Sequence, residues 1–239
     1  CPGKRSSDLD LMDYDFVYLT HGTLFGDLAF MLGKPAKKIK LFSVSTQMER
    51  NALLSEAYGY REDEVSLMGM ARYDAYGDVH AQKKIAFLPT WRSNIAGKII
   101  PGTSTREYVH HFKSTDFWKF YNALINDERL LDAMRRYGYT AEFYVHPAFE
   151  KQAGDFQGNE LVQVGKGSAD YERVLSESAL MVTDYSGVGF DFGYQRKPVV
   201  YSQYDSVFSG GHTYGEDSYF DYDIDGFGPV TRTLKETVD

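Results

Sequence analysis

Residues 179–201 read Ala-Leu-Met-Val-Thr-Asp-Tyr-Ser-Gly-Val-Gly-Phe-Asp-Phe-Gly-Tyr-Gln-Arg-Lys-Pro-Val-Val-Tyr. The apolar run 179–182 predicts a buried strand, and Ser186 is placed to cap a helix that starts at Gly187. Pro198 ends that helix, and a second apolar strand follows it directly. A strand, a tight turn and a helix in this order are typical of a parallel α/β sheet.

The turn between this strand and this helix is a predicted anion site. Backbone N–H groups at a helix start have no partner within the helix, and the positive end of the helix dipole faces outward there. Gly187 and Gly189 carry no side chain that would keep a phosphate away from these amides. An ordinary turn with a good helix cap is the alternative, because strand–turn–helix phosphate sites occur in many folds.

The alternation of strands and helices continues along the chain. Strands are expected over residues 16–19, 40–44, 65–68, 85–88, 142–145 and 161–164. Helices are expected over residues 46–58 and 170–176, and one or two helices over residues 117–134. Thr46 and Glu49 have the spacing of a capping box at the first of these helices. This pattern predicts parallel sheets with helices on both faces.

Three polar stretches interrupt the pattern. Residues 75–83 predict a boundary between two domains, 1–78 and 79–239. Residues 93–106 contain Gly, Ser and Thr and are expected to form a mobile loop. The acidic and aromatic stretch 219–225 is expected to be a solvated loop.

Composition and charge exclude several classes of function. The chain has 239 residues, of which 43% are hydrophobic, enough for one large or two small domains. Its net charge of −8 argues against binding to nucleic acid or anionic lipid. Cys1 is the single cysteine, so no internal disulfide forms, and a cytosolic setting is expected.

Several features bear on membranes and on the extent of the protein. No run approaches the roughly 20 apolar residues of a membrane span, and no signal peptide is visible. The chain begins with Cys-Pro-Gly-Lys-Arg instead of Met. We therefore expect a fragment of a longer protein.

Two histidines follow predicted strands directly. His21 lies just after strand 16–19, and His146 just after strand 142–145. In open α/β sheets, ligands bind at the carboxyl ends of the strands. An imidazole in such a place suits proton transfer near neutral pH, or a hydrogen bond to a phosphate.

Arg92 lies beyond another strand, in the run Pro89-Thr90-Trp91-Arg92. Its guanidinium suits a bidentate contact with a phosphate, and an arginine stacked on Trp91 is an equally good interpretation. No metal-ligand spacing and no Walker loop are present. Asp184 is interpreted as a structural acceptor that fixes its turn, because one carboxylate is a poor site for a divalent ion.

Six motifs occur together in the order found in one known family. They are Thr20-His21-Gly22-Thr23, Gly69-Met70-Ala71-Arg72-Tyr73-Asp74, Leu88-Pro89-Thr90-Trp91-Arg92, His146-Pro147, Thr183-Asp184-Tyr185-Ser186-Gly187 and Pro198-Val199-Val200-Tyr201. With them, the chain resembles the CDP-glycerol:poly(glycerophosphate) glycerophosphotransferases, the teichoic-acid polymerases and primases of bacteria. The resemblance covers residues 14–237 and includes the closing segment around residues 219–230.

The resemblance implies a glycosyltransferase-B-type α/β fold, in which two Rossmann-like parallel-sheet domains face a cleft that holds the active site. Residues 1–78 are then the C-terminal part of an incomplete, acceptor-side domain, and residues 79–239 are the domain that binds the nucleotide donor. The implied reaction transfers a polyol phosphate, such as glycerol phosphate, from a CDP-activated donor to a hydroxyl of a growing cell-wall or capsular polymer. CMP is released, and neither a cofactor nor a metal is implied.

The resemblance also implies a place of action. The acceptor is expected to be a lipid-linked polyol-phosphate or glycan polymer. A cytoplasmic protein, peripheral at the inner face of the cell membrane, would reach it through parts of the protein outside this chain. No nucleic-acid partner is expected.

The resemblance assigns roles to individual residues. His21 matches the family's catalytic histidine and is the implied base for the acceptor hydroxyl, and His146 matches a second catalytic histidine near the donor diphosphate. The residues matched to the diphosphate site are Thr183, Asp184, Ser186 and Gly187. Further phosphate or nucleotide contacts are expected from Thr23, Thr90 and Arg92.

Two positions depart from the family's pattern. After His-Gly-Thr, family members have proline and basic residues, whereas this chain has Leu24-Phe25-Gly26-Asp27, which leaves the acceptor open. Ala71 replaces a proline, so a rigid turn is lost. A nucleotide-sugar glycosyltransferase of the same fold remains an alternative, since it needs the same diphosphate site. A non-catalytic nucleotide- or anion-binding module is the other alternative, and the altered segment 24–27 motivates it.

Overall fold

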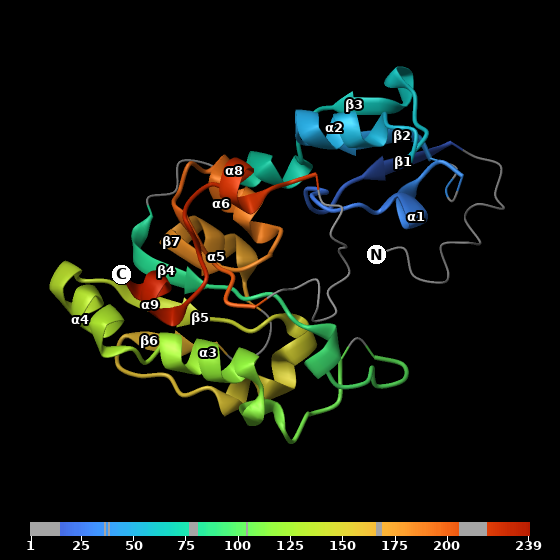
Figure 1. Cartoon of the computed structure of the whole chain (residues 1–239). Helices are drawn as coiled ribbons and strands as arrows, with labels where there is room; N and C mark the ends of the chain where they lie inside the picture. The colour runs from blue at the N-terminus through green and yellow to red at the C-terminus, as the bar shows by residue number, and fades with distance from the viewer. Residues whose placement is uncertain are drawn as a thin grey trace. The chain divides into compact units, whose positions relative to one another are not determined.

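The computed structural model describes residues 15–35, 37, 39–76, 81–103, 105–165, 169–205 and 219–239. They divide into two compact units (Figure 1). Unit 1 takes its described residues from Cys1–Ala75 and Tyr214–Phe220, and unit 2 takes them from Tyr76–Thr213 and Asp221–Asp239.

Unit 1 is built on a parallel sheet of three strands in the order β1-β2-β3. The strands are β1 (Phe16–Leu19), β2 (Ile39–Val44) and β3 (Val65–Leu67). The helices are α1 (Ala29–Leu32) and α2 (Gln47–Leu53), with 3-10 turns at Glu62–Glu64 and Ala71–Ala75. Tyr18 pairs in register with Phe42, and Phe42 pairs with Val65, so these three side chains share one face and form the core of the unit.

Two expectations for unit 1 are wrong in detail. Strand β1 is not buried on both faces, because Val17 and Leu19 are 48% and 65% exposed. Helix α2 ends at Leu53 instead of continuing to residue 58. Beyond Leu53 the chain forms tight turns, and Tyr58 lies buried with its hydroxyl accepting a hydrogen bond from the Leu28 amide at 2.7 Å.

Unit 2 is built on a parallel sheet of six strands in the order β6-β5-β4-β7-β8-β9. The strands are β4 (Gln82–Phe87), β5 (Thr140–Phe143), β6 (Val162–Val164), β7 (Ser178–Thr183), β8 (Val199–Ser202) and β9 (Val230–Thr231). Numbered within the unit, this order is 3-2-1-4-5-6, the strand order of doubly wound nucleotide-binding sheets. The order reverses between β4 and β7, which are direct neighbours.

Helices cover both faces of this sheet (Figure 1). They are α3 (Asp116–Leu124), α4 (Glu128–Tyr137), α5 (Tyr171–Glu177), α6 (Val188–Tyr194), α8 (Tyr222–Asp225) and α9 (Leu234–Val238), with 3-10 turns at Ser93–Ile95, Phe112–Ser114 and Pro147–Asp155. Phe87 of β4 joins a core with α3 and α4, whereas Ala86 joins a second core with α5 and α6. The strand is therefore apolar on both faces, as a central parallel strand must be.

The main differences from the expected elements of unit 2 are local. The one or two helices expected over residues 117–134 are two, because Asp127 caps α4 by accepting a hydrogen bond from the Arg129 amide. The stretch 219–225 contains the one-turn helix α8 instead of being wholly a loop. Strand β9 and helix α9 were not predicted, since both are very short. None of the described helices has the length and apolar character that a membrane crossing requires.

Candidate active site

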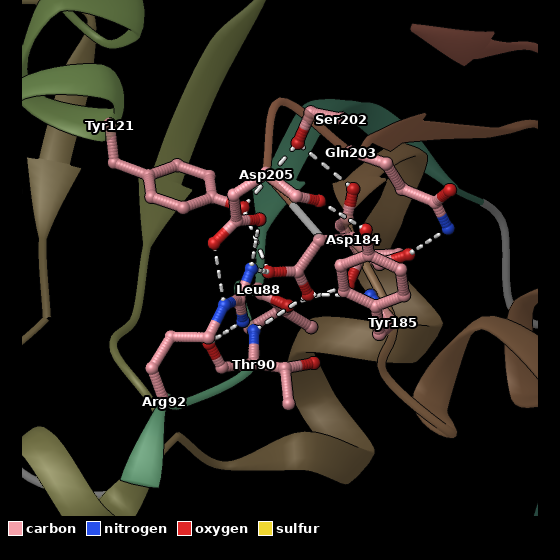
Figure 2. Close-up of polar contacts among 10 residues, drawn as sticks. Leu88, Thr90, Arg92, Tyr121, Asp184, Tyr185, Ser202, Gln203 and Asp205 are labelled. Carbon is pink, nitrogen blue, oxygen red and sulfur yellow. Dashed lines mark hydrogen bonds and ion pairs between the residues drawn. The ribbon is translucent and has the colours of Figure 1, made fainter. Parts of the chain in front are cut away.

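Two chain segments meet where the strand order of unit 2 reverses. Thr90 lies just beyond β4, and Asp184 lies just beyond β7. The Thr90 amide donates a hydrogen bond to Asp184 Oδ1 at 2.8 Å, which ties the two segments together (Figure 2). In sheets of this kind, ligands bind outside the carboxyl ends of the strands at this point.

Asp184 is completely buried and makes several hydrogen bonds within the protein. Besides the Thr90 amide, its carboxylate accepts from the Tyr185 amide at 2.6 Å, Arg92 Nη2 at 2.9 Å and Tyr121 Oη at 3.0 Å. A carboxylate that accepts four hydrogen bonds has few lone pairs left for a ligand. Asp184 is therefore a structural acceptor, as the sequence predicts, and not a direct contact for a diphosphate.

Arg92 is also buried, with only 2% of its surface exposed. Its Nε donates to Asp205 Oδ2 at 2.9 Å, its Nη1 donates to the Thr90 carbonyl at 2.8 Å, and its Nη2 lies between Asp184 and Asp205 (Figure 2). Burial opposes the charge of Arg92, but the two carboxylates outweigh it and raise the pKa of the guanidinium. Every nitrogen is engaged inside the protein, so the expected contact between Arg92 and a phosphate has no geometric support.

The alternative expectation for Arg92, stacking on Trp91, is wrong. The Arg92 guanidinium lies over the rings of Phe117 and Tyr185, at 5.7 and 5.4 Å from their centroids. The arginine over Trp91 is Arg106, at 4.8 Å from the ring centroid. The sequence did not indicate Arg106, because it lies 15 positions further along, in the segment expected to be a mobile loop.

Thr183 is a third residue with an internal role. Its side chain is fully buried, and its hydroxyl donates to the Leu88 carbonyl at 2.7 Å. Like the Thr90–Asp184 bond, this bond holds the end of β7 to the end of β4. Thr183 therefore shapes the turn and offers no free hydroxyl to a diphosphate.

Ser186 and Gly187 remain accessible in part. Helix α6 begins at Val188 with Gly187 at the cap position, one residue later than expected. The Ser186 hydroxyl accepts from the Val188 amide at a long 3.4 Å, so it is a weaker cap than the sequence suggested. Both residues are half-buried at the carboxyl end of β7, where a ligand can approach.

The hydroxyl of Thr90 is buried and has no hydrogen-bond partner among the described residues. Buried polar groups in proteins nearly always have a partner, and an exception needs an explanation. A ligand oxygen at the carboxyl end of β4 is one such explanation. The sequence-based expectation that Thr90 contacts a phosphate or nucleotide is therefore compatible with this geometry.

His146 lies beyond β5, the neighbour of β4 on the other side. Its Nδ1 accepts a hydrogen bond from the Ala148 amide at 3.1 Å, so the proton of the neutral ring is on Nε2. Burial is the main cause that lowers the pKa of His146 to about 4, Arg106 acts in the same direction, and Asp184 opposes them. At neutral pH, His146 is therefore an uncharged donor through Nε2–H.

In unit 1, His21 lies just beyond β1. Its carbonyl accepts a hydrogen bond from Arg72 Nη1, which links the first family-like motif to the Gly-Met-Ala-Arg motif. Partial burial and nearby positive charge, including that of Arg72, lower the pKa of the His21 imidazole. The ring is exposed and held in its neutral, basic form, as a general base requires.

Glu49 holds the loop after His21 in place. Its buried carboxylate accepts from the amides of Leu24 at 2.6 Å and of Ser45 and Thr46 at 2.8 Å each. The capping box with Thr46 is confirmed, but the bond to Leu24 spans 25 positions and was not predicted. The sequence therefore indicates the contact of Glu49 with nearby Thr46 but not its contact with distant Leu24.

Thr23 is drawn into the same network. It is 6% exposed, and its hydroxyl shares a hydrogen bond with Ser45 Oγ at 3.2 Å. Its expected contact with a phosphate is not supported by this position. The buried hydroxyl of Thr20, just before His21, has no partner within the part of the chain that the structure describes.

Metal-ligating side chains do not converge in the described residues. No group of three or more His, Cys, Asp or Glu side chains among them is arranged to hold a metal ion. The carboxylates of Asp184 and Glu49 are occupied by hydrogen bonds within the protein, and the groups with remaining capacity are backbone amides, hydroxyls and imidazoles. These groups suit an anionic ligand.

Fold and site together define a class of α/β protein. Its second unit has the strand order of nucleotide-binding sheets, with polar side chains at the place where that order reverses. The chain belongs to the CDP-Glycerol:Poly(glycerophosphate) glycerophosphotransferase family, whose model matches residues 32–239. The match includes five of the six motifs and begins after His21.

The curated relatives that the chain matches are named for the synthesis of teichoic acids or for transfer onto them. The chain is 33% identical over 230 residues to the minor teichoic acid biosynthesis protein GgaB of Bacillus subtilis, which covers 96% of this chain and 25% of that protein. It is 25% identical over 158 residues to a teichoic acid glycerol-phosphate transferase of Staphylococcus aureus, covering 66% of this chain and 35% of that protein. The chain thus spans about a quarter to a third of the length of these relatives.

Among solved structures, the chain is similar to the wall teichoic acid polymerase TagF. The TM-score is 0.64 with 17% identity, over 95% of this chain and 59% of that one. This similarity confirms the α/β fold with parallel sheets.

Proposed function

We propose that this chain carries the donor site and part of the acceptor site of an enzyme that transfers a polyol phosphate from a CDP-activated donor to a hydroxyl of a cell-wall polymer. Its membership of the glycerophosphotransferase family supports this reaction. So do the names of two relatives, a poly(ribitol-phosphate) polymerase and a glycerol-phosphate transferase, which share the transfer of a polyol phosphate. TagF has also been solved after a soak with CDPG.

One observation carries the proposal for the donor. Strands β5, β4 and β7 are neighbouring parallel strands. His146, Thr90 and the turn Ser186–Gly187 therefore all lie beyond the carboxyl ends of these strands, on the same side of the sheet. An imidazole N–H, an unpartnered buried hydroxyl and the amides before α6 are all hydrogen-bond donors. Several hydrogen-bond donors that lie together where the strand order reverses suit the oxygens of a diphosphate.

We further propose the two-domain arrangement of glycosyltransferases of the B type. In it, unit 1 is the C-terminal part of the acceptor-side domain, and unit 2 is the donor domain. His21 then acts as the base that takes the proton of the acceptor hydroxyl. Phosphoryl transfer needs charge stabilisation on one side of the reacting phosphorus and proton removal on the other, and His21 and His146 suit these two tasks.

In this scheme Asp184, Thr183 and Arg92 position the site without touching the donor. They hold the ends of β4 and β7 together, so that Thr90 and Ser186 keep a fixed separation. The acceptor is proposed to be a lipid-linked polyol-phosphate polymer at the inner face of the membrane, reached through other parts of the protein.

The proposal is tested with the full-length protein. Calorimetry should show binding of CDP-glycerol or CDP-ribitol in preference to UDP-sugars, and an assay with a polyol-phosphate acceptor should show release of CMP. Preference for a UDP-sugar would favour a glycosyltransferase. Binding without any release of CMP would favour a non-catalytic module.

A variant tests the turn before α6. Gly187→Val should weaken binding of CDP, because its branched side chain would occupy the space at the amides. Gly154→Val is the matched control, since a Cβ at Gly154 meets nothing within 4 Å. Unchanged CDP affinity in folded Gly187→Val protein would remove this turn from the proposed site.

A further inference from the structure

The donor diphosphate needs a positive charge, and Arg92 does not supply one. Its guanidinium is buried and engaged by Asp184 and Asp205. A doubly charged diphosphate bound by neutral donors alone would be poorly compensated. Another cation close to His146 is therefore required if the proposed function is correct.

Arg106 is that cation in the described part of unit 2. Its guanidinium lies 4.8 Å from the ring centroid of Trp91, and the Trp91 ring in turn stacks with His146 at 6.0 Å and 26°. Trp91 thus contacts both side chains and places the Arg106 guanidinium near His146, in agreement with the contribution of Arg106 to the lowered pKa of His146. Trp91 follows Thr90 directly, so Arg106 lies beside the edge where the donor groups converge.

Within the described residues, no acidic side chain neutralises the charge of Arg106. No carboxylate among them pairs with it, in contrast to Arg92, Arg129, Arg135 and Arg173. One nitrogen, Nη1, donates to the Gly97 carbonyl at 2.9 Å. The other N–H groups of the fork remain available, and the side chain is half-buried, which strengthens any bond to an anion.

A hairpin holds Arg106 in this position. Ile99 and Arg106 form an antiparallel bridge, supported by bonds from the Ile100 amide to the Thr105 carbonyl and from the Glu107 amide to the Lys98 carbonyl, at 2.9 Å each. Gly97 lets the two arms approach, because a Cβ there would collide with the carbonyl of Glu107. The segment expected to be a mobile loop thus contains paired arms that position the Arg106 side chain.

We propose that Arg106 binds the phosphates of the donor, beside the Nε2–H of His146, and provides the positive charge of the donor site. The guanidinium is held over Trp91 by the cation–π contact, which reduces the entropy lost when it pairs with a phosphate. This inference rests on the proposed function, because it names a residue for the same donor.

The test compares ligands that differ only in phosphate. In full-length protein, Arg106→Gln should weaken CDP binding about 10- to 100-fold, the usual range for charge-assisted hydrogen bonds. Its affinity for cytidine, which has no phosphate, should stay the same. The salt dependence of CDP binding should also decrease, because one ionic contact is lost. Arg106→Lys keeps the charge without the planar fork and should lose less affinity than Arg106→Gln.

Arg136→Gln is the matched control. Arg136 also lies over an aromatic ring, that of Tyr137 at 5.4 Å. It lies at the C-terminal end of α4, just before β5 begins, whereas His146 lies beyond the end of β5. Its CDP affinity should equal that of the unsubstituted protein. Wild-type CDP affinity in Arg106→Gln, or an equal loss for cytidine, would overturn the role of Arg106 alone. Failure of the unsubstituted protein to bind CDP would overturn the proposed function itself.

Discussion

Arg92 Nη2 and Asp184 Oδ2 form an ion pair of 2.9 Å in which the two side chains are 3% and 0% exposed. The pair joins the segment after β4 to the segment after β7 (Figure 2). Charges this deep in a protein persist only when each is paired and hydrogen-bonded, which Tyr121, Thr90 and Asp205 provide. The proposed donor site thus lies beside a buried network of paired polar groups.

Removal of one partner should therefore be costly. Asp184→Ala leaves the buried charge of Arg92 with Asp205 alone, and we expect the free energy of unfolding to fall by about 3–5 kcal/mol. Chemical denaturation measures this change. Asp132→Ala is the control, because Asp132 forms an exposed pair with Arg135, and it should change stability by no more than about 0.5 kcal/mol. A loss below about 1 kcal/mol in Asp184→Ala would contradict the structural role.

His146 should titrate far below the ordinary histidine range. Its pKa of about 4 lies below the usual 6.5 because the ring is buried, so folding favours the neutral form. The stability that this group contributes is present above pH 6.5 and is lost as the pH falls from 6.5 towards 4. NMR titration of the ring signals, assigned with His146→Gln, checks this expectation. A midpoint near 6.5 would show that the ring is open to water.

Substitutions of the two histidines proposed to be catalytic should have different effects. His21→Ala should lower turnover about 10²–10⁴-fold with donor affinity nearly kept, the pattern of a lost acid–base group. His146→Ala should weaken donor binding as well as turnover, and His146→Gln should restore part of the affinity, since an amide N–H can replace Nε2–H. Donor titrations and rates in full-length protein measure both. Equal loss of donor affinity in His21→Ala and His146→Ala would contradict the assignment of His21.

The pH dependence of turnover gives a further check on His21. Because its pKa is lowered, the acid limb of the rate profile should lie below pH 6.5. Arg72→Gln removes one of the positive charges that lower this pKa, so the limb should move to higher pH. A limb that does not move would mean that His21 is not the group that titrates.

Glu49 should be essential for the stability of unit 1. Glu49→Ala leaves the partly buried amides of Leu24, Ser45 and Thr46 without their acceptor, and we expect a loss of about 2–4 kcal/mol. Hydrogen exchange should also show faster opening of residues 20–24. Glu56→Ala, at an exposed position of the same unit, is the control. Equal exchange rates in both variants would show that the loop does not depend on Glu49.

Most of the secondary structure followed from local patterns. The apolar runs 16–19 and 179–182 correctly predicted parallel strands, although only the second is largely buried, and Thr46 and Glu49 form the capping box that their spacing predicts. Very short elements such as β9 escaped prediction, because two residues carry no periodicity. The pairing of residues 97–100 with residues 105–107 escaped prediction because it comes from contacts between the two arms and from Trp91 beneath Arg106, not from local propensity.

The amino-acid order alone determined the fold class, the strand ends and the residues placed there, because strand periodicity and turn residues act over a few positions. Only the tertiary structure decided which of those residues face a ligand. Arg92, Asp184 and Thr183 turned inward because the ends of β4 and β7 are adjacent and their polar groups must pair once buried. Arg106 instead lies half-buried near His146 with no carboxylate partner among the described residues, because contacts between distant parts of the chain decide which charge is neutralised and which remains available.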